Sequence, residues 1–255
     1  MGLEMFSAPG SLGSSSFGET RLWRATHGNK LKNDMMRDSI KLWKELEQES
    51  GEELLIQFPV LTMGSMNNED YLDVIKQFPG HPTMTPVEIS ENFPALQNIP
   101  ADYEGILHCE GGIVKAKKAL NAACDLAQYK YGAEVKFDSK VLKITSNSCT
   151  LENGETYTAK NIIICAGAYS KTFDKEKVSH KREIEYLVFD DVEGLPKGII
   201  EFDSNGNEYY GMVDGEKLDR YKIGQFSTRS LENMVSYFNT RLPGKACSFR
   251  YIHPC

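Results

Sequence analysis

The sequence predicts a mixed α/β fold of the α+β kind, in which two lobes are interleaved along the chain. Helical patterns and short strands alternate up to Ala166, and the apolar run Ile162–Ile164 is typical of a buried strand in a parallel sheet. Beyond it, β runs separated by turn clusters predict an antiparallel sheet. With 255 residues, of which 40% are hydrophobic, the chain can bury the core that such a fold needs.

Helical periodicity and capping residues mark the predicted helices. From Leu31 to Ser50 apolar residues recur three to five positions apart among charged ones, as in an amphipathic helix that packs by one face. Thr85, Pro86 and Glu88 supply an N-cap, a first-turn proline and a capping box, so a short helix begins there and ends at Pro94. The other helices are predicted at Glu69–Phe78, Ile113–Tyr131 and Leu231–Leu242.

Runs of β-forming residues between turn residues mark the strands. Leu54–Gly64 is predicted as two strands bent at Pro59, and Asn153–Gly154 is the usual dipeptide of a tight hairpin turn. Asn161–Cys165 is expected to be a strand buried on both faces. The other strands are predicted at Glu134–Phe137, Val141–Thr145, Thr150–Leu151, Thr156–Thr158, Ile184–Phe189, Ile199–Phe202, Glu208–Met212 and Tyr221–Phe226.

Charge and hydropathy argue against two classes of partner. The net charge is -7, and lysines and arginines are scattered between acidic residues, so no basic stripe exists to attract nucleic acid. No apolar run approaches the roughly 20 residues that span a bilayer, and no basic segment followed by an apolar one opens the chain. We therefore expect neither a nucleic-acid partner, nor a membrane helix, nor a secretion signal.

The cysteines indicate a reduced intracellular compartment and no metal site. They are far apart, with neither CxxC pairing nor clusters of His and Cys at zinc spacing. Their positions are Cys109, Cys124, Cys149, Cys165, Cys247 and Cys255.

The most informative stretch is Ser14–Arg24, a Gly/Ser-rich loop followed by two arginines three residues apart. If a helix begins there, Arg21 and Arg24 lie on one face one turn apart, where both guanidinium groups can hold an anion such as a carboxylate. The alternative interpretation is an ordinary connector with solvated surface arginines.

Several motifs together carry a family resemblance. They are the loop with Thr20-Arg21-x-x-Arg24, the amphipathic helix with Leu42-Trp43 at its middle, Pro59–Gly64, Gly111–Val114 and Tyr157–Tyr169. Their order resembles the sarcosine/pipecolate oxidase branch of the FAD-dependent D-amino-acid-oxidase superfamily. The resemblance covers most of residues 1–250.

The resemblance implies a fold and its division into lobes. An incomplete FAD/NAD(P)-binding lobe is interleaved with a substrate-binding lobe built on an antiparallel sheet. The FAD lobe takes residues 1–60 and 105–175, the substrate lobe takes residues 61–104 and 176–246, and residues 247–255 are a truncated return to the FAD lobe.

The resemblance also implies which residues contact the cofactor, FAD. Arg21 matches the arginine beside the flavin, and Glu4 falls where the family places a carboxylate that accepts hydrogen bonds from the adenosine ribose. Cys247 matches a cysteine that forms a thioether to the flavin in several members. Without the resemblance, Glu4 is an inert residue and Cys247 a small buried hydrophobe. The other matched positions are Ser15, Ser16, Thr20, Gly167 and Val141, whose backbone meets the adenine.

Three residues are matched to catalysis. Arg24 corresponds to the arginine that grips the substrate carboxylate, and Tyr210 to a tyrosine over the substrate. Lys222 corresponds to a lysine at the reactive edge of the flavin, where a cation stabilises the negative charge that develops on oxygen. The plain alternatives are a strand lysine that faces water and aromatic residues that are simply good β formers.

The implied activity is oxidation of a secondary amine or amino acid by FAD, with O2 as the acceptor, giving an imine and H2O2. The partners are then a small amine substrate and O2, and a monomer in the cytoplasm or peroxisome is expected, although His253-Pro254-Cys255 does not resemble the Ser-Lys-Leu address.

An alternative is a catalytically inactive, truncated paralogue or a binding module that retains the substrate lobe. The glycine-rich turn that binds phosphate is expected to be missing ahead of Met1, and an NAD-dependent dehydrogenase would need the same turn.

Overall fold

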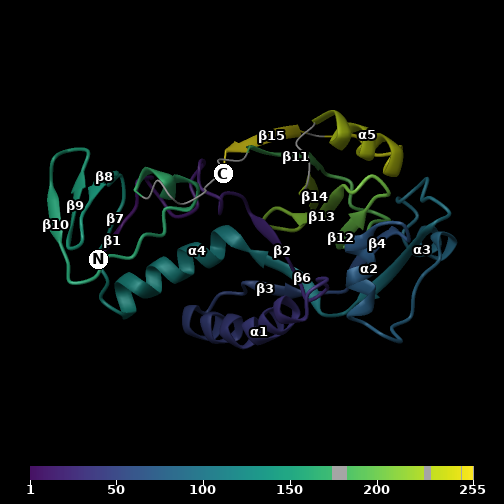
Figure 1. Cartoon of the computed structure of the whole chain (residues 1–255), viewed down its shortest axis with the longest axis horizontal. Helices are drawn as coiled ribbons and strands as arrows, with labels where there is room; N and C mark the ends of the chain where they lie inside the picture. Colours follow the sequence, from purple (N-terminus) through teal and green to yellow (C-terminus); the bar gives the residue numbers. More distant parts are fainter. Residues whose placement is uncertain (174–182, 227–230, 248, 255) are drawn as a thin grey trace. The chain divides into compact units, whose positions relative to one another are not determined.

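The computed structural model describes residues 1–173, 183–226, 231–247 and 249–254, which form two compact units (Figure 1). Unit one comprises Met1–Gly18, Ala116–Glu183 and His253–Cys255, and unit two comprises Glu19–Lys115 and Ile184–Ile252. The chain thus passes from one unit to the other and back. Residues 19–60 and 105–115, which the sequence placed in the FAD lobe, belong to unit two.

Unit one contains a short parallel strand pair and a three-stranded meander. β1 (Gly2–Leu3) runs parallel to β7 (Val135–Lys136). The meander has the order β10-β9-β8, and Gly154, with φ +89°, supplies the left-handed position in the turn expected at Asn153–Gly154. Its strands are β8 (Val141–Ile144), β9 (Ser148–Leu151) and β10 (Thr156–Thr158).

Two expectations in this part of the chain are wrong. The helix expected from Ile113 begins only at Ala116, as α4 (Ala116–Asp125), and ends in a π-helical turn, η1 (Leu126–Lys130). The residues before it form a strand, β6 (Gly111–Lys115), in which a side chain on Gly112 would lie 2.1 Å from the carbonyl oxygen of Ile56. An apolar helical pattern does not reveal such a close approach of two backbones.

The strand expected at Asn161–Cys165 is also not formed. This segment has no regular structure, and the side chain of Ile163 is 86% exposed. An apolar run becomes a buried strand only where neighbouring strands satisfy its N–H and C=O groups on both edges. Within the described residues no strand pairs with it. The segment leads into the short 3-10 helix η2 (Gly167–Thr172).

Unit two is built on a seven-stranded sheet with the order β15-β11-β14-β13-β12-β4-β5. β12 and β4 are parallel, whereas the pairs β11–β14, β14–β13, β13–β12 and β4–β5 are antiparallel, which confirms the antiparallel character expected here. The strands are β4 (Val60–Ser65), β5 (Tyr103–His108), β11 (Glu183–Phe189), β12 (Gly198–Phe202), β13 (Glu208–Asp214), β14 (Arg220–Gln225) and β15 (Phe249–Pro254).

A second sheet in unit two has the order β2-β6-β3, with β2 at Thr20–Arg24 and β3 at Leu55–Gln57. The helix considered for Arg21 and Arg24 is therefore wrong. In a strand, residues three apart point to opposite sides. β2 is a strand because it pairs with β6, about 90 residues further along the chain, from Thr20↔Lys115 to Arg24↔Gly111.

The helices of unit two follow their local signals. α3 (Pro86–Asn92) begins with the expected capping box between Thr85 and Glu88. α1 (Lys30–Ser50) is capped by Asn29 and ends at Gly51, yet Leu31 and Met35, expected on its packed face, are exposed. The other two helices are α2 (Glu69–Lys76) and α5 (Leu231–Arg241).

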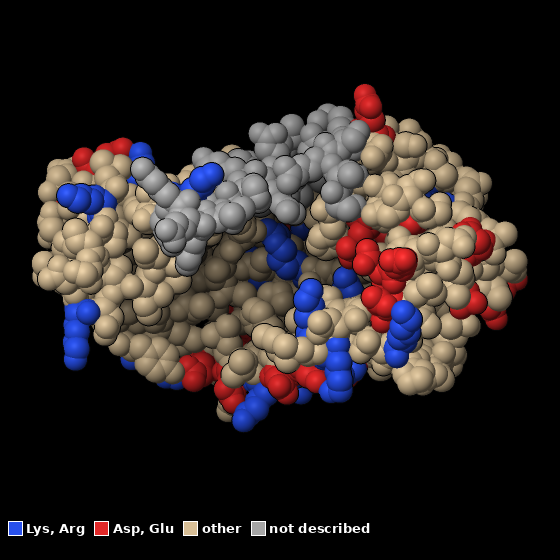
Figure 2. All heavy atoms as spheres, in the orientation of Figure 1, with Lys and Arg blue, Asp and Glu red and all other residues tan. Residues whose placement is uncertain are grey.

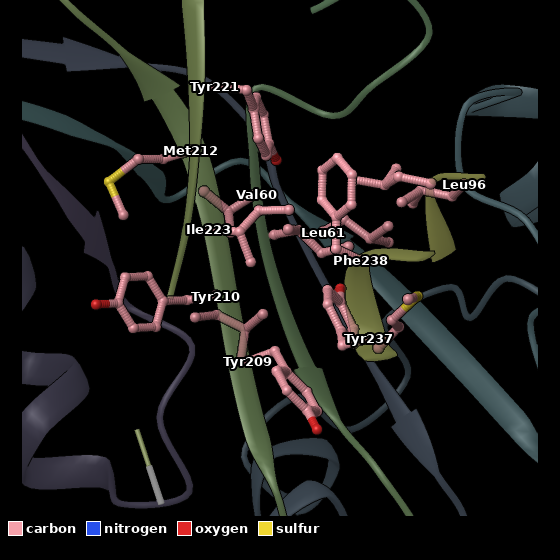
Figure 3. Packing of buried hydrophobic residues seen from close by; sticks show 14 of the residues in the cluster. Val60, Leu61, Leu96, Tyr209, Tyr210, Met212, Tyr221, Ile223, Tyr237 and Phe238 are labelled. Atoms are coloured by element: carbon pink, nitrogen blue, oxygen red, sulfur yellow. The ribbon is translucent and has the colours of Figure 1, made fainter. Parts of the chain in front are cut away.

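The two faces of the seven-stranded sheet carry different side chains. On one face α5 covers the core, with the rings of Tyr209 and Tyr237 stacked at 4.1 Å and those of Phe189 and Phe238 at 5.3 Å. Figure 3 shows Tyr210 and Met212 on the side of β13 opposite Tyr209. This second face, which we call the Tyr210 face, is where the second sheet packs, since Leu22 of β2 lies 3.0 Å from the Cβ position of Gly198.

Charged side chains are distributed over the surface of the protein. On the face drawn in Figure 2, lysine and arginine side chains are interspersed with acidic ones and form no continuous basic stripe. Among the described residues no helix is long and apolar enough to cross a bilayer, and no cluster of His, Cys, Asp and Glu could hold a metal ion.

Candidate active site

Strand register gathers the candidate residues of unit two on the Tyr210 face. Side chains two apart in a strand share a face, and directly paired residues of neighbouring strands share it too. Met212 pairs with Lys222 and Tyr210 pairs with Gly224. Tyr210 and Lys222, which are 12 positions apart in the sequence, therefore project from the same side of the sheet.

Lys222 is fully buried, with a side chain that is 1% exposed. Its ammonium donates hydrogen bonds to the backbone carbonyl of Thr20 (2.9 Å) and to Oδ1 of Asp214 (3.2 Å), and lies 3.5 Å from the Thr20 hydroxyl. It also lies 5.2 Å from the centre of the Tyr186 ring, within the range of a cation–π contact. The alternative of a strand lysine facing water is therefore wrong.

The charge of Lys222 depends on a balance between burial and pairing. Burial lowers the pKa of Lys222 to about 8, although attraction to Asp214 partly opposes the change, and the positive charge of Arg21 lowers it further. Burial would raise the pKa of Asp214, but Lys222 and the Thr20 hydroxyl hold it below its ordinary value. The pair is consequently ionised at neutral pH.

Arg21 meets Lys222 at one backbone carbonyl. Nη1 of Arg21 donates a hydrogen bond to the carbonyl oxygen of Thr20 at 2.8 Å, and Lys222 donates to the same atom. Two cations that share an acceptor repel each other, which is why Arg21 contributes to the low pKa of Lys222. Thr20, Arg21 and Lys222 thus lie together at one end of β2, whereas Arg24 lies at the other end.

Arg24 lies at the other end of β2, on the side of that strand that faces the Tyr210 face. Its Nη2 donates to Oε1 of Glu208 (3.2 Å), and its Nη1 donates to the carbonyl of Thr26. Burial lowers the pKa of Arg24 to about 10, and Glu208 partly offsets this. Burial likewise raises the pKa of Glu208. An internal carboxylate therefore contacts the guanidinium that was matched to the substrate carboxylate.

Tyr210 belongs to an aromatic group beside Lys222. Its ring centre lies 4.3 Å from that of Phe226 and 6.3 Å from that of Tyr186, the ring that Lys222 contacts. Gly224 lies directly beneath Tyr210, because a Cβ at this position would be only 2.5 Å from the tyrosine ring. The glycine therefore lets Tyr210 lie flat over β14.

Cys247 is close to the same part of the sheet. Its Sγ donates to the backbone carbonyl of Val188 at 3.5 Å, and Val188 pairs with Lys222 in the register of β11 and β14. The side chain is exposed, so the alternative of a small buried hydrophobe is wrong. Cys109, Cys124, Cys149 and Cys165 are free thiols as well, while Cys255 lies outside the described residues.

The remaining cofactor candidates lie in unit one. Glu4 follows the parallel strand β1, its backbone carbonyl accepts from the amide of Ser139 (2.8 Å), and its Oε1 accepts from the amide of Phe6 (3.1 Å). Val141 follows two residues after Ser139, so it lies near Glu4. A carboxylate at the carboxyl end of a parallel strand is the usual partner of an adenosine ribose in dinucleotide-binding folds.

The Gly/Ser-rich loop of unit one packs on the start of η2. Phe6 and Tyr169 meet edge to face at 6.4 Å, and Gly13, with φ +101°, has no room for a side chain against Phe6. Gly167 opens η2 with φ +51°. Ser15 is exposed and Ser16 is half-buried within this loop. The backbone of the loop is therefore held in place while Ser15 remains accessible.

Two site residues, Asp214 and Glu208, were missed in the sequence. Asp214 stands before Gly215 and was part of an ordinary turn signal, and Glu208 opens a strand at a position where polar residues are common. Their partners, Thr20 and Arg24, are 194 and 184 positions away. The sequence offered one signal for these two residues. Each is a charged residue at a strand position that alternates with apolar residues.

The chemistry of these groups suits a flavin. Lys222, which is buried, and Arg21, which is half-buried, offer cationic N–H donors for an electron-rich ring. Tyr210 and Phe226 offer aromatic faces, and Glu4 offers a ribose acceptor. Each set lies within one unit. The donor set and the fold thus have the chemistry that a flavin-binding α/β protein needs.

Comparison with known proteins gives the family. The model of the FAD dependent oxidoreductase family, DAO, matches residues 3–226. The chain therefore belongs to this family, whose cofactor is FAD, and the resemblance drawn from Thr20–Arg24 and the later motifs is confirmed.

Its curated relatives include sarcosine oxidases. The chain is 29% identical over 174 residues to the peroxisomal sarcosine oxidase of Homo sapiens, a match that covers 66% of this chain and 44% of the relative. It is 29% identical over 167 residues to the probable sarcosine oxidase of Arabidopsis thaliana, covering 61% and 40%. The chain thus matches less than half the length of these relatives.

Solved structures share the fold. An open form of NikD, described as an unusual amino acid oxidase, superposes on this chain with a TM-score of 0.81 at 17% sequence identity. The alignment covers 99% of this chain and 74% of the NikD chain. Glycine oxidase from Geobacillus kaustophilus gives a TM-score of 0.70 at 19% identity, covering 99% and 75%. The expected mixed fold of helices and antiparallel sheet is therefore confirmed.

Proposed function

We propose that the protein, with FAD bound, oxidises a small secondary amine or amino acid of the sarcosine or pipecolate type and uses O2 as the electron acceptor. The family and the relatives named sarcosine oxidase support the reaction class. The observation that carries the proposal is the buried, charged Lys222, which shares the carbonyl of Thr20 with Arg21.

The family resemblance supplies the residues that we assign to FAD. Arg21, Thr20 and Lys222 would hold the ring end, and Glu4 the ribose. The loop serines Ser15 and Ser16, together with Val141 and Gly167, would line the rest of the cofactor, and Cys247 would supply a thioether. When bound, FAD would supply the redox chemistry of amine oxidation, in which the amine loses two electrons and two protons to give an imine and O2 takes them up to give H2O2.

Lys222 supplies charge where the reaction needs it. A fixed ammonium in a site without water stabilises the negative charge that develops when O2 takes its first electron. Since the pKa of Lys222 is about 8, the ammonium is present at neutral pH. Arg21 adds a second positive charge at the carbonyl of Thr20.

Arg24 and Tyr210 would select the substrate. Arg24 is assigned to the substrate carboxylate and Tyr210 to the substrate-facing wall. Because Glu208 already contacts Arg24, a bound carboxylate has to displace Glu208 or share the guanidinium with it. Burial raises the pKa of Glu208, so protonation of this carboxyl, which would release Arg24, costs less than for a solvated glutamate.

The protein is proposed to act as a monomer in the cytoplasm or the peroxisome. The relatives from Homo sapiens and Mus musculus are named peroxisomal, which supports the second compartment. Fluorescence microscopy of the tagged protein with a peroxisomal marker distinguishes the two, and size-exclusion chromatography with light scattering tests the monomer.

Flavin titration and a peroxide assay test the proposed function. Purified protein is titrated with FAD while flavin fluorescence is followed, and peroxide is then measured with sarcosine, pipecolate and a primary amino acid. We expect quenched fluorescence at micromolar protein and peroxide with at least one N-methyl or cyclic amino acid. Lys222→Met should bind FAD but react with O2 about 10²- to 10³-fold more slowly.

Two results contradict the proposal. Unquenched flavin at micromolar protein would favour a binding module without flavin chemistry. Flavin binding with equal peroxide rates for wild type and Lys222→Met would remove Lys222 from the reaction with O2. Lys217→Met, in the exposed turn before β14, serves as the matched control for loss of a cation away from the buried pair.

A further inference from the structure

A buried carboxylate completes the surroundings of Lys222. Asp214 ends β13, and its side chain is 5% exposed. Its Oδ1 accepts a hydrogen bond from the Thr20 hydroxyl at 2.5 Å and from the Lys222 ammonium at 3.2 Å, and the backbone amide of Gly215 contributes a further bond. The three side chains of Thr20, Asp214 and Lys222 thus form one closed network between β2, β13 and β14.

We propose that Asp214 is a positioning residue that keeps the Lys222 ammonium charged and fixed beneath β2, with Thr20 joining the two side chains. The inference rests on the proposed function, in which the charge of Lys222 serves the reaction with O2. The family resemblance assigned a role to Lys222 and none to Asp214.

Burial gives the physical reason. A lysine in a site without water loses its proton unless an opposite charge or hydrogen-bond acceptors stabilise the ammonium. Asp214 and Glu19 favour the charged form of Lys222, Arg21 opposes it, and the Tyr186 ring lies against the ammonium. Asp214 is the carboxylate that touches Nζ directly. Its removal therefore leaves the ammonium with backbone and hydroxyl acceptors and an adjacent arginine.

Geometry gives the second reason. A lysine side chain is flexible, and its three donors rotate freely. Here the carbonyl of Thr20 and Oδ1 of Asp214 approach Nζ, and the Thr20 hydroxyl in turn donates to Oδ1. Moving Nζ breaks two charge-assisted bonds, so the network defines where the positive charge lies.

The direct test is the titration of Lys222 in the protein. Lysine labelled with 13C at Cε is followed by NMR from about pH 4 to pH 11, and Lys222→Met assigns the signal. The wild-type midpoint is expected at about 8. Asp214→Asn should lower it by about 1–3 pH units, because an adjacent opposite charge shifts a pKa by that amount. Asp219→Asn removes an exposed carboxylate in the same hairpin and should leave the midpoint unchanged.

A second pair of variants covers the case in which Asp214→Asn does not fold. Thr20→Val removes the hydroxyl between the two side chains without changing any charge, and Thr20→Ser keeps it. We expect Thr20→Val to lower the Lys222 midpoint and Thr20→Ser to restore it. Equal midpoints for wild type, Asp214→Asn and Thr20→Val would overturn the inference.

The test of Asp214 can succeed or fail independently of the proposed oxidase function. The NMR titration reports the coupling of Asp214 and Lys222 whether or not amines are oxidised, so a shifted midpoint in a protein that forms no peroxide supports the coupling and rejects the oxidase. In an active protein, the pH above which the rate of the O2 reaction falls should equal the titration midpoint of Lys222. This pH should be lower in Asp214→Asn than in the wild type. A value that stays at the wild-type pH would overturn the functional part of the inference.

Discussion

Two buried ion pairs lie on opposite faces of the seven-stranded sheet, and they differ in how many hydrogen bonds the carboxylate accepts from its cation. Under α5, Arg241 forms a forked contact with Glu201, with Nη2 to Oε1 at 2.6 Å and Nε to both oxygens at 3.0 and 3.1 Å. On the Tyr210 face, Lys222 approaches a single oxygen of Asp214 at 3.2 Å.

The consequence is seen in the pKa of each cation. Burial alone would lower the pKa of Arg241, but Glu201 outweighs it, so the pKa lies above the ordinary arginine value. For Lys222 burial outweighs Asp214, and the pKa falls to about 8. One pair is permanently charged and holds α5 on the sheet, whereas the other can change its charge near physiological pH, as functional groups often do.

The largest expected effect is loss of the structural pair. Arg241→Ala leaves Glu201 buried without its partner, and breaking a buried pair in this way costs about 3–5 kcal/mol of the free energy of unfolding. Urea denaturation followed by circular dichroism measures it. A loss below about 1 kcal/mol would show that this pair does not anchor α5.

A somewhat smaller effect is expected in the pH dependence of stability. Between pH 8 and 10.5 the unfolded chain keeps a proton on Lys222 that the folded protein has released, so the free energy of unfolding rises with pH over this interval. The rise amounts to about 3 kcal/mol at most. It is measured as the difference between wild type and Lys222→Met in urea melts at each pH. A difference that stays flat, or falls, across this interval contradicts the lowered pKa.

One glycine on each face of the sheet lies against a tyrosine ring, so an added methyl group tests how tightly each face is packed. A Cβ on Gly211 would lie 2.6 Å from Tyr221, whose hydroxyl donates to the carbonyl of Pro196, and a Cβ on Gly224 would lie 2.5 Å from Tyr210. We expect Gly211→Ala to lose about 2–3 kcal/mol by overpacking the core. Gly224→Ala should lose about 1 kcal/mol and displace Tyr210.

Unfolding curves and the NMR signals of the tyrosine rings check this pair of variants. Equal losses, with the Tyr210 ring unmoved in Gly224→Ala, would contradict the expectation that Tyr210, which is 8% exposed, can move aside whereas Tyr221, which is 1% exposed, cannot.

The smallest effect is expected on the surface. Lys30 and Asp34 form an exposed i,i+4 pair in α1, with side chains 80% and 41% exposed. Lys30→Ala should change stability by less than about 0.5 kcal/mol. The same urea melts provide the measurement, and a loss comparable to that of Arg241→Ala would undermine the assignment of large effects to buried pairs.

Local signals in the sequence predicted the elements that depend on local chemistry. The capping box of Thr85 and Glu88 and the turn at Asn153–Gly154 are formed by residues within three positions of each other, and both are found as expected. The motif around Arg21 gave the family, which the comparisons confirm.

What could not be predicted depends on residues far apart in the chain. Thr20–Arg24 is a strand only because β6 lies beside it, and Asn161–Cys165 remains irregular because no described strand pairs with it. The contact of Thr20 with Asp214 spans 194 positions, so periodicity in a local window carries no trace of it. The cation of the site was therefore found from the sequence, and its carboxylate was not.

A crystal structure of the protein grown with FAD tests the central claim most directly. We predict that the isoalloxazine ring lies on the Tyr210 face, in contact with Lys222 and Arg21, while Asp214 still pairs with the ammonium. A flavin bound elsewhere, with Lys222 and Arg21 away from its ring, would contradict this prediction.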